Sequence, residues 1–393
     1  MFCAAGKTNV SACSGDSGGG MFFNTDGTWY LRGIVSTIPS TTFDGRPVCD
    51  YTKYTVFTDV SKFRNWILRY TNPAKWLKEL KPCLDDADTG CNAGRRHGYD
   101  FFIVFRRFSI NLVPLNARQS TTNVDTDGWG LHFNYDCTKG QMYWTRHLGA
   151  NIYSTNYNGA DHRTLIIQGL QPTTLAVDWI SRRLYWGDRE KQTIEVASIE
   201  NIHVRTVLLD DEMPWSMAVD PHLGKLYWTI ATSKGYSIIK SCNLDGSDRK
   251  EFVKRQSESQ RFIVGIKVSM ATGELCYFYE ETNQIECIDT RTKRTRTVAS
   301  NIYHRTYFSV TDELFYWAEY NGNKIESIDD HGVRQKPINI GSSDEINEIE
   351  MVSGNCPMFY SQCAVNNGGC RKNTICLLSP RDSSGITCKK IET

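Results

Sequence analysis

Five segments of this 393-residue chain repeat one pattern of apolar and polar positions. Each contains a pair of aromatic residues, and apolar and polar residues alternate on either side of the pair. Alternation with a period of two, interrupted by Gly, Asn and Asp, predicts short β-strands joined by turns. The five aromatic segments are residues 142–146, 184–188, 226–230, 276–280 and 315–319.

The spacing of these segments predicts a closed ring of repeats. Their central tyrosines lie 42, 42, 50 and 39 residues apart, and a period near 40 with about four strands per repeat is typical of a β-propeller. A degenerate sixth copy precedes them at residues 101–105, 110–113 and 131–136, so we expect six blades. The aromatic pairs are predicted core residues because large aromatic side chains bury much apolar area and suit strands. The tyrosines are Tyr143, Tyr185, Tyr227, Tyr277 and Tyr316.

Residues 99–393 resemble the YWTD propeller of the low-density-lipoprotein receptor family. The resemblance rests on the repeated Tyr-Trp-x-Asp motif and on repeated Leu-Ala-Val-Asp strands. The copy that ends at Asp188 has the complete Tyr-Trp-x-Asp motif. In that family each repeat gives three strands to one blade and its innermost strand to the next. This implies that residues 349–352 complete the first blade, and closure removes free sheet edges. Glu280 and Glu319 are conservative at the acidic position but Arg146 and Ile230 are not, which implies weaker polar contacts between blades.

A small cysteine module follows the last repeat. Residues 356–393 resemble an epidermal-growth-factor-like module, which in the receptor family packs against the last blade. By that resemblance Cys363 pairs with Cys376 and Cys370 with Cys388, and the module is truncated because the fifth and sixth cysteines are missing.

Four cysteines lie inside the predicted propeller. Cys276 and Cys287 stand on the two arms of a predicted hairpin that turns at Thr282-Asn283, near enough to form a disulfide. Cys137 and Cys242 have no obvious partners.

Residues 1–70 carry a different set of motifs. The segment 13–19, Cys-Ser-Gly-Asp-Ser-Gly-Gly, resembles the nucleophile loop of chymotrypsin-type serine proteases. Residues 1–6, 33–36, 54–60 and 63–67 resemble the flanking strands and terminal helix in family order. The resemblance implies Ser17 as nucleophile, the backbone N–H groups of Gly15 and Ser17 as oxyanion hole, and Asp16 as the partner of a freed amino terminus. It also implies a Cys13–Cys49 disulfide.

Catalysis by a serine needs more than the nucleophile. Its hydroxyl requires an adjacent histidine as base and an acid that orients the histidine. In the protease family both precede the serine, whereas all eight histidines here follow it, starting at His97. We therefore expect a vestigial Ser17 and an inactive serine endopeptidase segment. The substrate-pocket positions imply an ancestor that cut after small apolar residues, and they are Ser11, Ser36, Ile38 and Thr55.

Composition limits the partners. The 45 basic and 44 acidic residues balance, so bulk charge favours neither nucleic acid nor an anionic membrane. Fourteen cysteines, several at close spacings, indicate an oxidising, extracellular setting. No apolar run reaches the roughly 18 residues that span a bilayer. The acidic run 85–88 lacks the ligand alternation of a calcium loop, and we expect no metal and no cofactor.

The predicted fold class is mainly β. We expect a partial trypsin-like β-barrel at 1–70, a linker or junction at 71–98, a six-bladed YWTD propeller at 99–355 and a truncated module at 356–393. Both ends resemble interrupted domains, so we interpret the chain as fused or fragmentary.

Three functions fit these domains. The first is an extracellular ligand-binding module of a lipoprotein-receptor-like endocytic or signalling receptor, secreted or in an ectodomain whose membrane attachment lies in a longer parent. The alternative is a secreted mosaic serine endopeptidase of chymotrypsin- or elastase-like specificity. A third is a matrix protein, since similar propellers bind basement-membrane proteins by resemblance.

The expected partner of the propeller is an extracellular protein of lipoprotein, matrix or signalling type. Trp and Arg are favoured contact residues, although Trp215 could instead pack between blades. The predicted binding face comprises loops ahead of the innermost strands, with Pro172, Thr173, Pro214, Trp215, Arg261, His304 and Arg305. A further hypothesis is release of the ligand at low pH through His147, His162, His203, His222, His304 and His331.

Overall fold

Two compact units make up the computed structural model of this chain, Met1–Lys75 and Trp76–Thr393. The predicted linker and the terminal helix expected at 63–67 lie outside the described residues. The structure describes residues 2–4, 12–13, 16–25, 28–38, 40–43, 46–50, 53–60, 100–115, 121–147, 149–166, 171–269, 272–303, 305–311, 314–341, 344–352, 361–380 and 385–391.

The first unit contains one four-stranded antiparallel sheet and one hairpin. The sheet has the strand order β1-β6-β3-β2, and β4 pairs with β5. Thr55, Phe57 and Asp59 of β6 are buried while the residues between them are half-buried, which is the period-two alternation of a strand with one covered face. The strands are β1 (Phe2–Ala4), β2 (Gly20–Thr25), β3 (Thr28–Thr37), β4 (Ser40–Phe43), β5 (Arg46–Cys49) and β6 (Thr55–Asp59).

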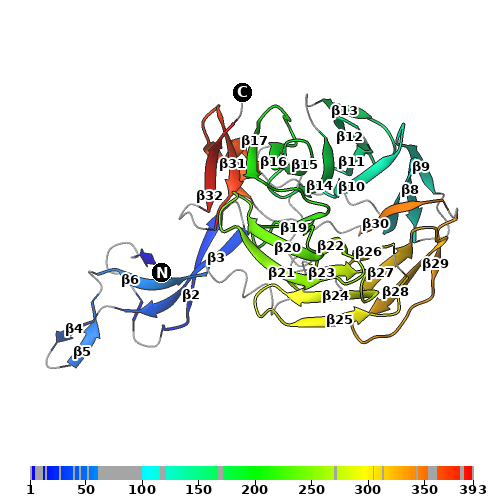
Figure 1. Cartoon of the computed structure of the whole chain (residues 1–393). Helices are drawn as coiled ribbons and strands as arrows, with labels where there is room; N and C mark the ends of the chain where they lie inside the picture. Colours follow the sequence, from blue (N-terminus) through cyan, green and yellow to red (C-terminus); the bar gives the residue numbers. More distant parts are fainter. Residues whose placement is uncertain are drawn as a thin grey trace. The chain divides into compact units, whose positions relative to one another are not determined.

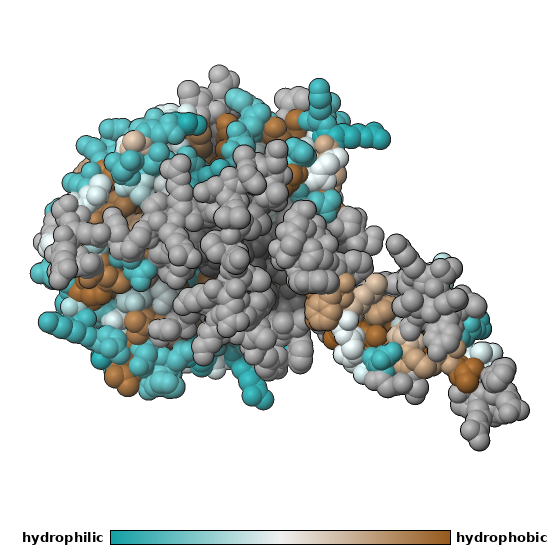
Figure 2. Space-filling model, turned by 180° about the vertical axis from the view of Figure 1, so that it is seen from behind, coloured by the Kyte–Doolittle hydropathy of each residue, from teal (hydrophilic) through white to brown (hydrophobic). Residues whose placement is uncertain are grey.

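Six four-stranded sheets arranged in a ring form most of the second unit (Figure 1). This confirms the predicted six-bladed propeller, and we number the blades 1 to 6. In the view of Figure 2, hydrophilic residues gather around the outer edge of this larger body. From the innermost strand outwards, blade 1 contains β30 (Ile346–Val352), β7 (Phe101–Arg106), β8 (Ser109–Pro114) and β9 (Thr122–Asp125).

The other five blades follow the chain in order from the innermost strand outwards. Blade 2 contains β10 (Gly130–Asp136), β11 (Gln141–Arg146), β12 (Asn151–Asn156) and β13 (Arg163–Ile166). Blade 3 contains β14 (Pro172–Asp178), β15 (Arg183–Asp188), β16 (Thr193–Ser198) and β17 (Arg205–Asp210). Blade 4 contains β18 (Met217–Asp220), β19 (Lys225–Ala231), β20 (Tyr236–Asn243) and β21 (Lys250–Gln256). Blade 5 contains β22 (Ile263–Ser269), β23 (Glu274–Tyr279), β24 (Gln284–Asp289) and β25 (Thr295–Ala299). Blade 6 contains β26 (Thr306–Val310), β27 (Leu314–Glu319), β28 (Lys324–Asp329) and β29 (Ile338–Asn339).

A strand from the C-terminal part of the propeller closes the ring. In blade 1, β30 pairs with β7, with Ile349 opposite Val104 and Met351 opposite Phe102. Each innermost strand contacts the next around the ring, and β30 contacts β10. The prediction that residues 349–352 complete the first blade is therefore confirmed. Because β30 pairs with β7, this edge of β7 is covered by a strand of the same chain and cannot pair with another molecule.

The aromatic pairs form the cores between blades, as predicted. Trp144, Trp186 and Trp228 are fully buried. Successive residues of a strand point to opposite faces, so the Trp of a pair packs on the preceding blade and the Tyr on the following one. Tyr143, for example, shares a core cluster with Leu184 and Trp186 of blade 3.

The fifth aromatic pair has a different register from the one predicted. Leu275 and Tyr277 pack with Tyr227 of blade 4, while Cys276 packs with Trp317 of blade 6. Tyr277 therefore occupies the Trp position of blade 5, and Cys276 occupies the Tyr position. The spacing-based assignment of Tyr277 as the repeat's tyrosine was wrong by one residue.

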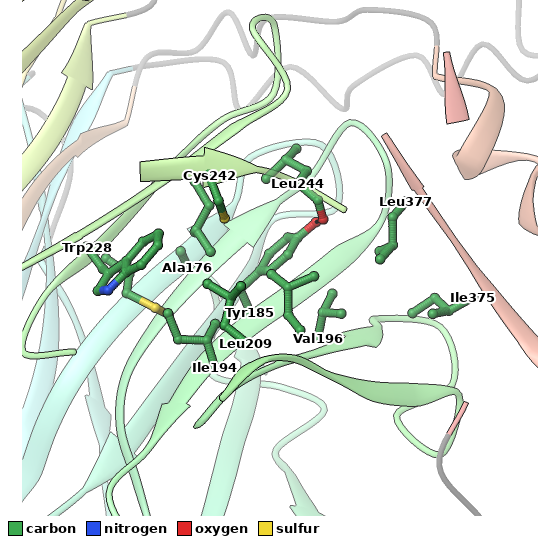
Figure 3. Packing of buried hydrophobic residues seen from close by; sticks show 13 residues of the cluster. Ala176, Tyr185, Ile194, Val196, Leu209, Trp228, Cys242, Leu244, Ile375 and Leu377 are labelled. Carbon is green, nitrogen blue, oxygen red and sulfur yellow. Dashed lines mark hydrogen bonds between the residues drawn. The ribbon is translucent and has the colours of Figure 1, made fainter. Parts of the chain in front are cut away.

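The C-terminal module packs against blade 3. Ile375 and Leu377 of β31 (Thr374–Leu378) share a core cluster with Val196 and Tyr185 (Figure 3), and Arg183 donates hydrogen bonds to the carbonyls of Cys376 at 2.8 Å and Cys363 at 3.3 Å. The expected contact with the last blade is wrong, because the apolar side of β31 faces the cluster between blades 3 and 4. The module also contains η2 (Gln362–Ala364), η3 (Asn366–Gly369) and β32 (Ile386–Lys390).

Four disulfides join cysteines that the sequence analysis paired. Their Cα atoms lie 4.0 to 5.6 Å apart, within the usual range or just below it. Cys137, for which the sequence offered no obvious partner, is also disulfide-bonded. Cys242 is a free, buried thiol, and burial raises its pKa to about 12. The pairs are Cys13–Cys49, Cys276–Cys287, Cys363–Cys376 and Cys370–Cys388.

Candidate functional site

The strongest candidate site is the end of the propeller at which the innermost strands begin, which we call the mouth. Here four innermost strands contain a β-bulge directly after their first residue. A bulge adds one residue to the strand and redirects its side chain. The added residues are Leu131, Thr173, Val264 and Asn347.

Trp215 occupies the corresponding place in blade 4. Trp215 lies two residues before Met217, the first residue of β18. Its backbone N–H donates a hydrogen bond to the carbonyl of Thr229 at 3.0 Å. The side chain is 62% exposed, so the alternative that it packs between blades is wrong. A hydrogen-bonded strand entry thus presents a large aromatic side chain to solvent.

The other residues predicted for the binding face divide into two groups. Arg261 and Arg305 are exposed at the mouth, whereas Pro172 and Pro214 are buried and cannot contact a partner directly. Thr173 is half-buried, and its hydroxyl lies 3.3 Å from the carbonyl of Pro214, so it links blades 3 and 4. The predicted His304 lies outside the described residues.

A cavity of about 290 Å³ opens at the mouth between blades 5 and 6. Val264 supplies an apolar wall, and Arg305 and Glu280 place opposite charges on the rim. The backbone N–H of Arg305 donates a hydrogen bond to the Glu280 carboxylate at 3.3 Å. This bond joins the segment before β26 to the segment after β23. Thr306, Tyr307 and Tyr320 complete the lining.

Several exposed apolar residues at the mouth were missed from the sequence. Trp129 is 40% exposed directly ahead of β10, Met213 is 44% exposed ahead of Trp215, and Tyr303 is 69% exposed ahead of β26. The Arg107 guanidinium lies 4.0 Å from the centroid of the Trp129 ring, a cation–π contact that fixes the indole. Each of these residues lies just before an innermost strand, and this position in the repeat could have identified them from the sequence.

Beneath the mouth lies a buried network of charges. Lys267 of β22 donates to Glu348 at 2.6 Å and also contacts Glu350, and Ser309 bonds Glu350 at 3.0 Å. Burial disfavours the ammonium, yet the two carboxylates raise the pKa of Lys267. The same ammonium lowers the pKa of Glu348 against the effect of burial, whereas burial and Glu348 raise the pKa of Glu350. The network joins blades 1, 5 and 6 below the mouth.

His132 is the histidine that this network involves, and the pH-release hypothesis did not include it. Its Nδ1 lies 3.3 Å from Glu348. Burial lowers the pKa of His132, while Glu348 and a hydrogen bond to the backbone of Trp215 act in the opposite direction. The imidazole therefore connects the charge network to the segment that carries Trp215.

The N-terminal unit holds Ser17 on an exposed turn. Asp16 accepts a hydrogen bond from the Cys13 N–H at 2.7 Å. The turn is bonded to β3, because Gly18 N–H donates to Val35 at 3.0 Å and Val35 N–H donates to Gly19 at 2.9 Å. By the protease resemblance, the Asp16 carboxylate would pair with a freed amino terminus. In this structure it accepts a hydrogen bond from the backbone of its own loop.

The predicted pocket residues of this unit lie at the ends of two paired strands. Val56 pairs with Thr37, which brings Thr55 of β6 next to the segment that contains Ser36 and Ile38. Thr55 is buried, Ile38 half-buried and Ser36 exposed. Gly15 and Ser11 lie outside the described residues, so their predicted roles stay predictions.

Among the described residues, no group of three or more His, Cys, Asp or Glu side chains is arranged to hold a metal ion. No described helix has the length and apolar character needed to cross a membrane.

Known proteins of two kinds are similar to parts of this chain. Residues 1–67 match the trypsin family model. Over 294 residues, 74% of the chain, the sequence is 34% identical to nidogen of Drosophila melanogaster, and the match covers 22% of that protein. A stretch of 69 residues, 17% of the chain, is 39% identical to low-density lipoprotein receptor-related protein 5 of Mus musculus, of which it covers 4%. The chain thus spans less than a quarter of the length of these relatives.

A solved structure shows the same fold. The crystal structure of a nidogen/laminin complex matches with a TM-score of 0.58 at 20% identity, over 65% of this chain and all of the matched chain. Together these findings support a propeller of the YWTD kind, related to that of nidogen and of LDL-receptor-related proteins, and a trypsin-like N-terminal segment.

Proposed function

We propose that the propeller is an extracellular protein-binding module and that its mouth binds a matrix protein. The observation that carries the proposal is the exposed Trp215 on a hydrogen-bonded strand entry, near the exposed Met213. Aromatic and arginine side chains are enriched among the residues that dominate protein interfaces. Val264 and the exposed Arg305 extend this surface to the neighbouring cavity.

The matrix assignment rests on the relatives. The match to nidogen extends over 74% of the chain, against 17% for the receptor-related protein. The structural neighbour is titled as a complex of nidogen with laminin. These findings favour the matrix hypothesis over an endocytic or signalling receptor, and we propose laminin as the first partner to test.

The test measures binding of the purified chain to immobilised laminin by surface plasmon resonance. We expect saturable binding that Trp215→Ala weakens by at least about 30-fold, because truncating a central aromatic contact costs roughly 2 kcal/mol or more. Val333→Ala is the matched control, since Val333 is 56% exposed in the β28–β29 turn at the opposite end of the strands. Absence of binding by the unmodified chain would refute the laminin assignment. Equal binding by Trp215→Ala would refute the mouth as the site.

The inactivity of Ser17 stays a prediction. Labelling of Ser17 by an organophosphorus reagent would contradict it, because such labelling needs an activated serine.

A further inference from the structure

A second surface lies on blades 4 and 5, at the end of the strands opposite the mouth. Residues 291–296 read Arg-Thr-Lys-Arg-Thr-Arg, with four basic residues in six. Clusters of this density are typical of polyanion-binding segments. The run spans the turn from β24 to β25 and the first two residues of β25, and Arg291, Lys293 and Arg294 in the turn are exposed.

The turn brings Lys293 to two lysines of blade 4. The Lys293 ammonium lies 3.1 Å from the centroid of the Phe252 ring on β21. Burial, followed by the charges of Lys250 and Lys225, lowers the pKa of Lys293 to about 8, and Asp289 acts in the opposite direction. Three ammonium groups from two blades therefore converge on one place.

The carboxylates among these cations are already engaged. Asp248 accepts from Lys225 at 3.2 Å and from Lys250 at 2.9 Å, and these bonds lower its pKa to about 2. Asp289 accepts the backbone N–H groups of Arg291 and Thr292, both at 2.8 Å. The groups that project to solvent from this surface are thus mainly cationic.

Neighbouring acidic residues do not cancel this charge. Glu274 and Asp330 both bind Arg296, at 2.8 and 3.1 Å. Among the described residues, the Arg294 side chain takes part in no ion pair. We define the basic ridge as Lys225, Lys250, Arg291, Lys293 and Arg294.

We propose that the basic ridge binds a sulfated polysaccharide. A linear chain with closely spaced sulfate groups can contact both blades at once and relieve the repulsion among the three lysines. The disulfides indicate an oxidising compartment, where sulfated polysaccharides are available and nucleic acids are not the usual polyanion. The basic and acidic residues of the whole chain balance, so its net charge does not reveal this local excess of positive charge. The proposal does not depend on the mouth or on laminin.

The experiment is chromatography of the full chain on immobilised heparin, followed by binding measurements at several salt concentrations. We expect Lys293→Ala/Arg294→Ala to elute at lower salt and to bind about tenfold more weakly. The slope of log Kd against log salt should also fall by about two, one for each lost contact. The control is Lys234→Ala/Arg261→Ala, which removes the same charge from exposed residues at the mouth end of blades 4 and 5.

The outcomes separate the alternatives. If both double variants weaken binding equally, or neither does, the basic ridge is not the site and the proposal fails. If DNA of matched charge competes as well as heparin, the assignment to sulfated polysaccharide fails. Heparin whose sulfates have been removed should not bind.

A second measurement needs no variant. Heparin should protect Lys293 and Lys250 from acetylation, as read by mass spectrometry, and should leave Lys234 reactive. Equal protection of Lys234 would contradict the proposal even if a variant failed to fold.

Discussion

Blades 4 and 5 fill the same structural position with different chemistry. In blade 4 the position is occupied by Trp228, whose indole N–H donates to the buried Glu212 at 2.8 Å. In blade 5 it is occupied by Tyr277, whose hydroxyl donates to Glu286 at 2.7 Å and accepts from Arg255 at 3.1 Å. Each blade therefore keeps a large buried aromatic ring and a carboxylate anchor, although the residues differ.

The neighbouring position differs more strongly between the two blades. Tyr227 fills it in blade 4 and contacts the Phe252 ring at 5.2 Å. Cys276 fills it in blade 5 and is bonded across the strand pair to Cys287. A covalent cross-link thus stands where blades 2, 3, 4 and 6 have a tyrosine ring. The repeat therefore constrains the packing of this position more tightly than the identity of its residue.

The largest effect is expected from truncating the aromatic ring of blade 4. Trp228→Ala should lower the free energy of unfolding by about 4 kcal/mol, because it leaves a cavity and removes a hydrogen bond from Glu212. Tyr277→Phe in blade 5 keeps the ring and should cost about 1 kcal/mol. Urea denaturation of both variants checks the difference, and a loss below about 2 kcal/mol for Trp228→Ala would show that blade 4 relaxes around the cavity.

The next effect distinguishes the innermost strands of the two blades. Lys267 of blade 5 and Ala218 of blade 4 lie at equivalent positions, each opposite the residue that fills the tyrosine position. Lys267→Met should cost about 3 kcal/mol because it leaves Glu348 and Glu350 buried without their cation.

A rescue experiment tests that cause. Adding Glu348→Gln and Glu350→Gln to Lys267→Met should recover part of the lost stability, since no unpaired charge is then buried. If the triple variant is as unstable as Lys267→Met, the loss comes from packing rather than from charge.

The smallest of the three effects concerns the cross-link of blade 5. Cys276→Ala/Cys287→Ala should cost about 2–3 kcal/mol, the usual contribution of a short disulfide loop. Thermal unfolding in the absence of reductant measures it, with Cys242→Ala as the control because that thiol is free. An unchanged melting temperature would mean that hydrogen bonds between β23 and β24 alone hold the hairpin.

Much of the ring could be predicted because propellers repeat simple patterns. The alternating segments and their period predicted six blades, and residues 349–352 were assigned to closure by a family resemblance. The register of blade 5 was not predictable in the same way. Tyr277-Phe278 looks like a Tyr-Trp pair in a sequence, and only the sides on which Leu275, Tyr277 and Cys276 pack reveal the shift.

The site was predicted only in part for a similar reason. Exposure of Trp215 follows from the backbone at the strand entry, which residue types do not encode. Lys267 and Glu350 look like surface residues of a strand in the sequence, but they are brought together from strands about 80 residues apart. The side of the C-terminal module that is buried was not predictable either, because it depends on the contact between β31 and blade 3.

Ring closure has a consequence for synthesis. Arg106 at the end of β7 bonds the carbonyl of Asp344, which follows it by 238 residues. At about 5–20 residues per second, the ribosome makes the closing strand on the order of 10–50 seconds after β7. Throughout that interval the edge of β7 on which β30 later pairs is exposed, so the nascent chain must be kept from pairing with other chains until its last blade strand emerges.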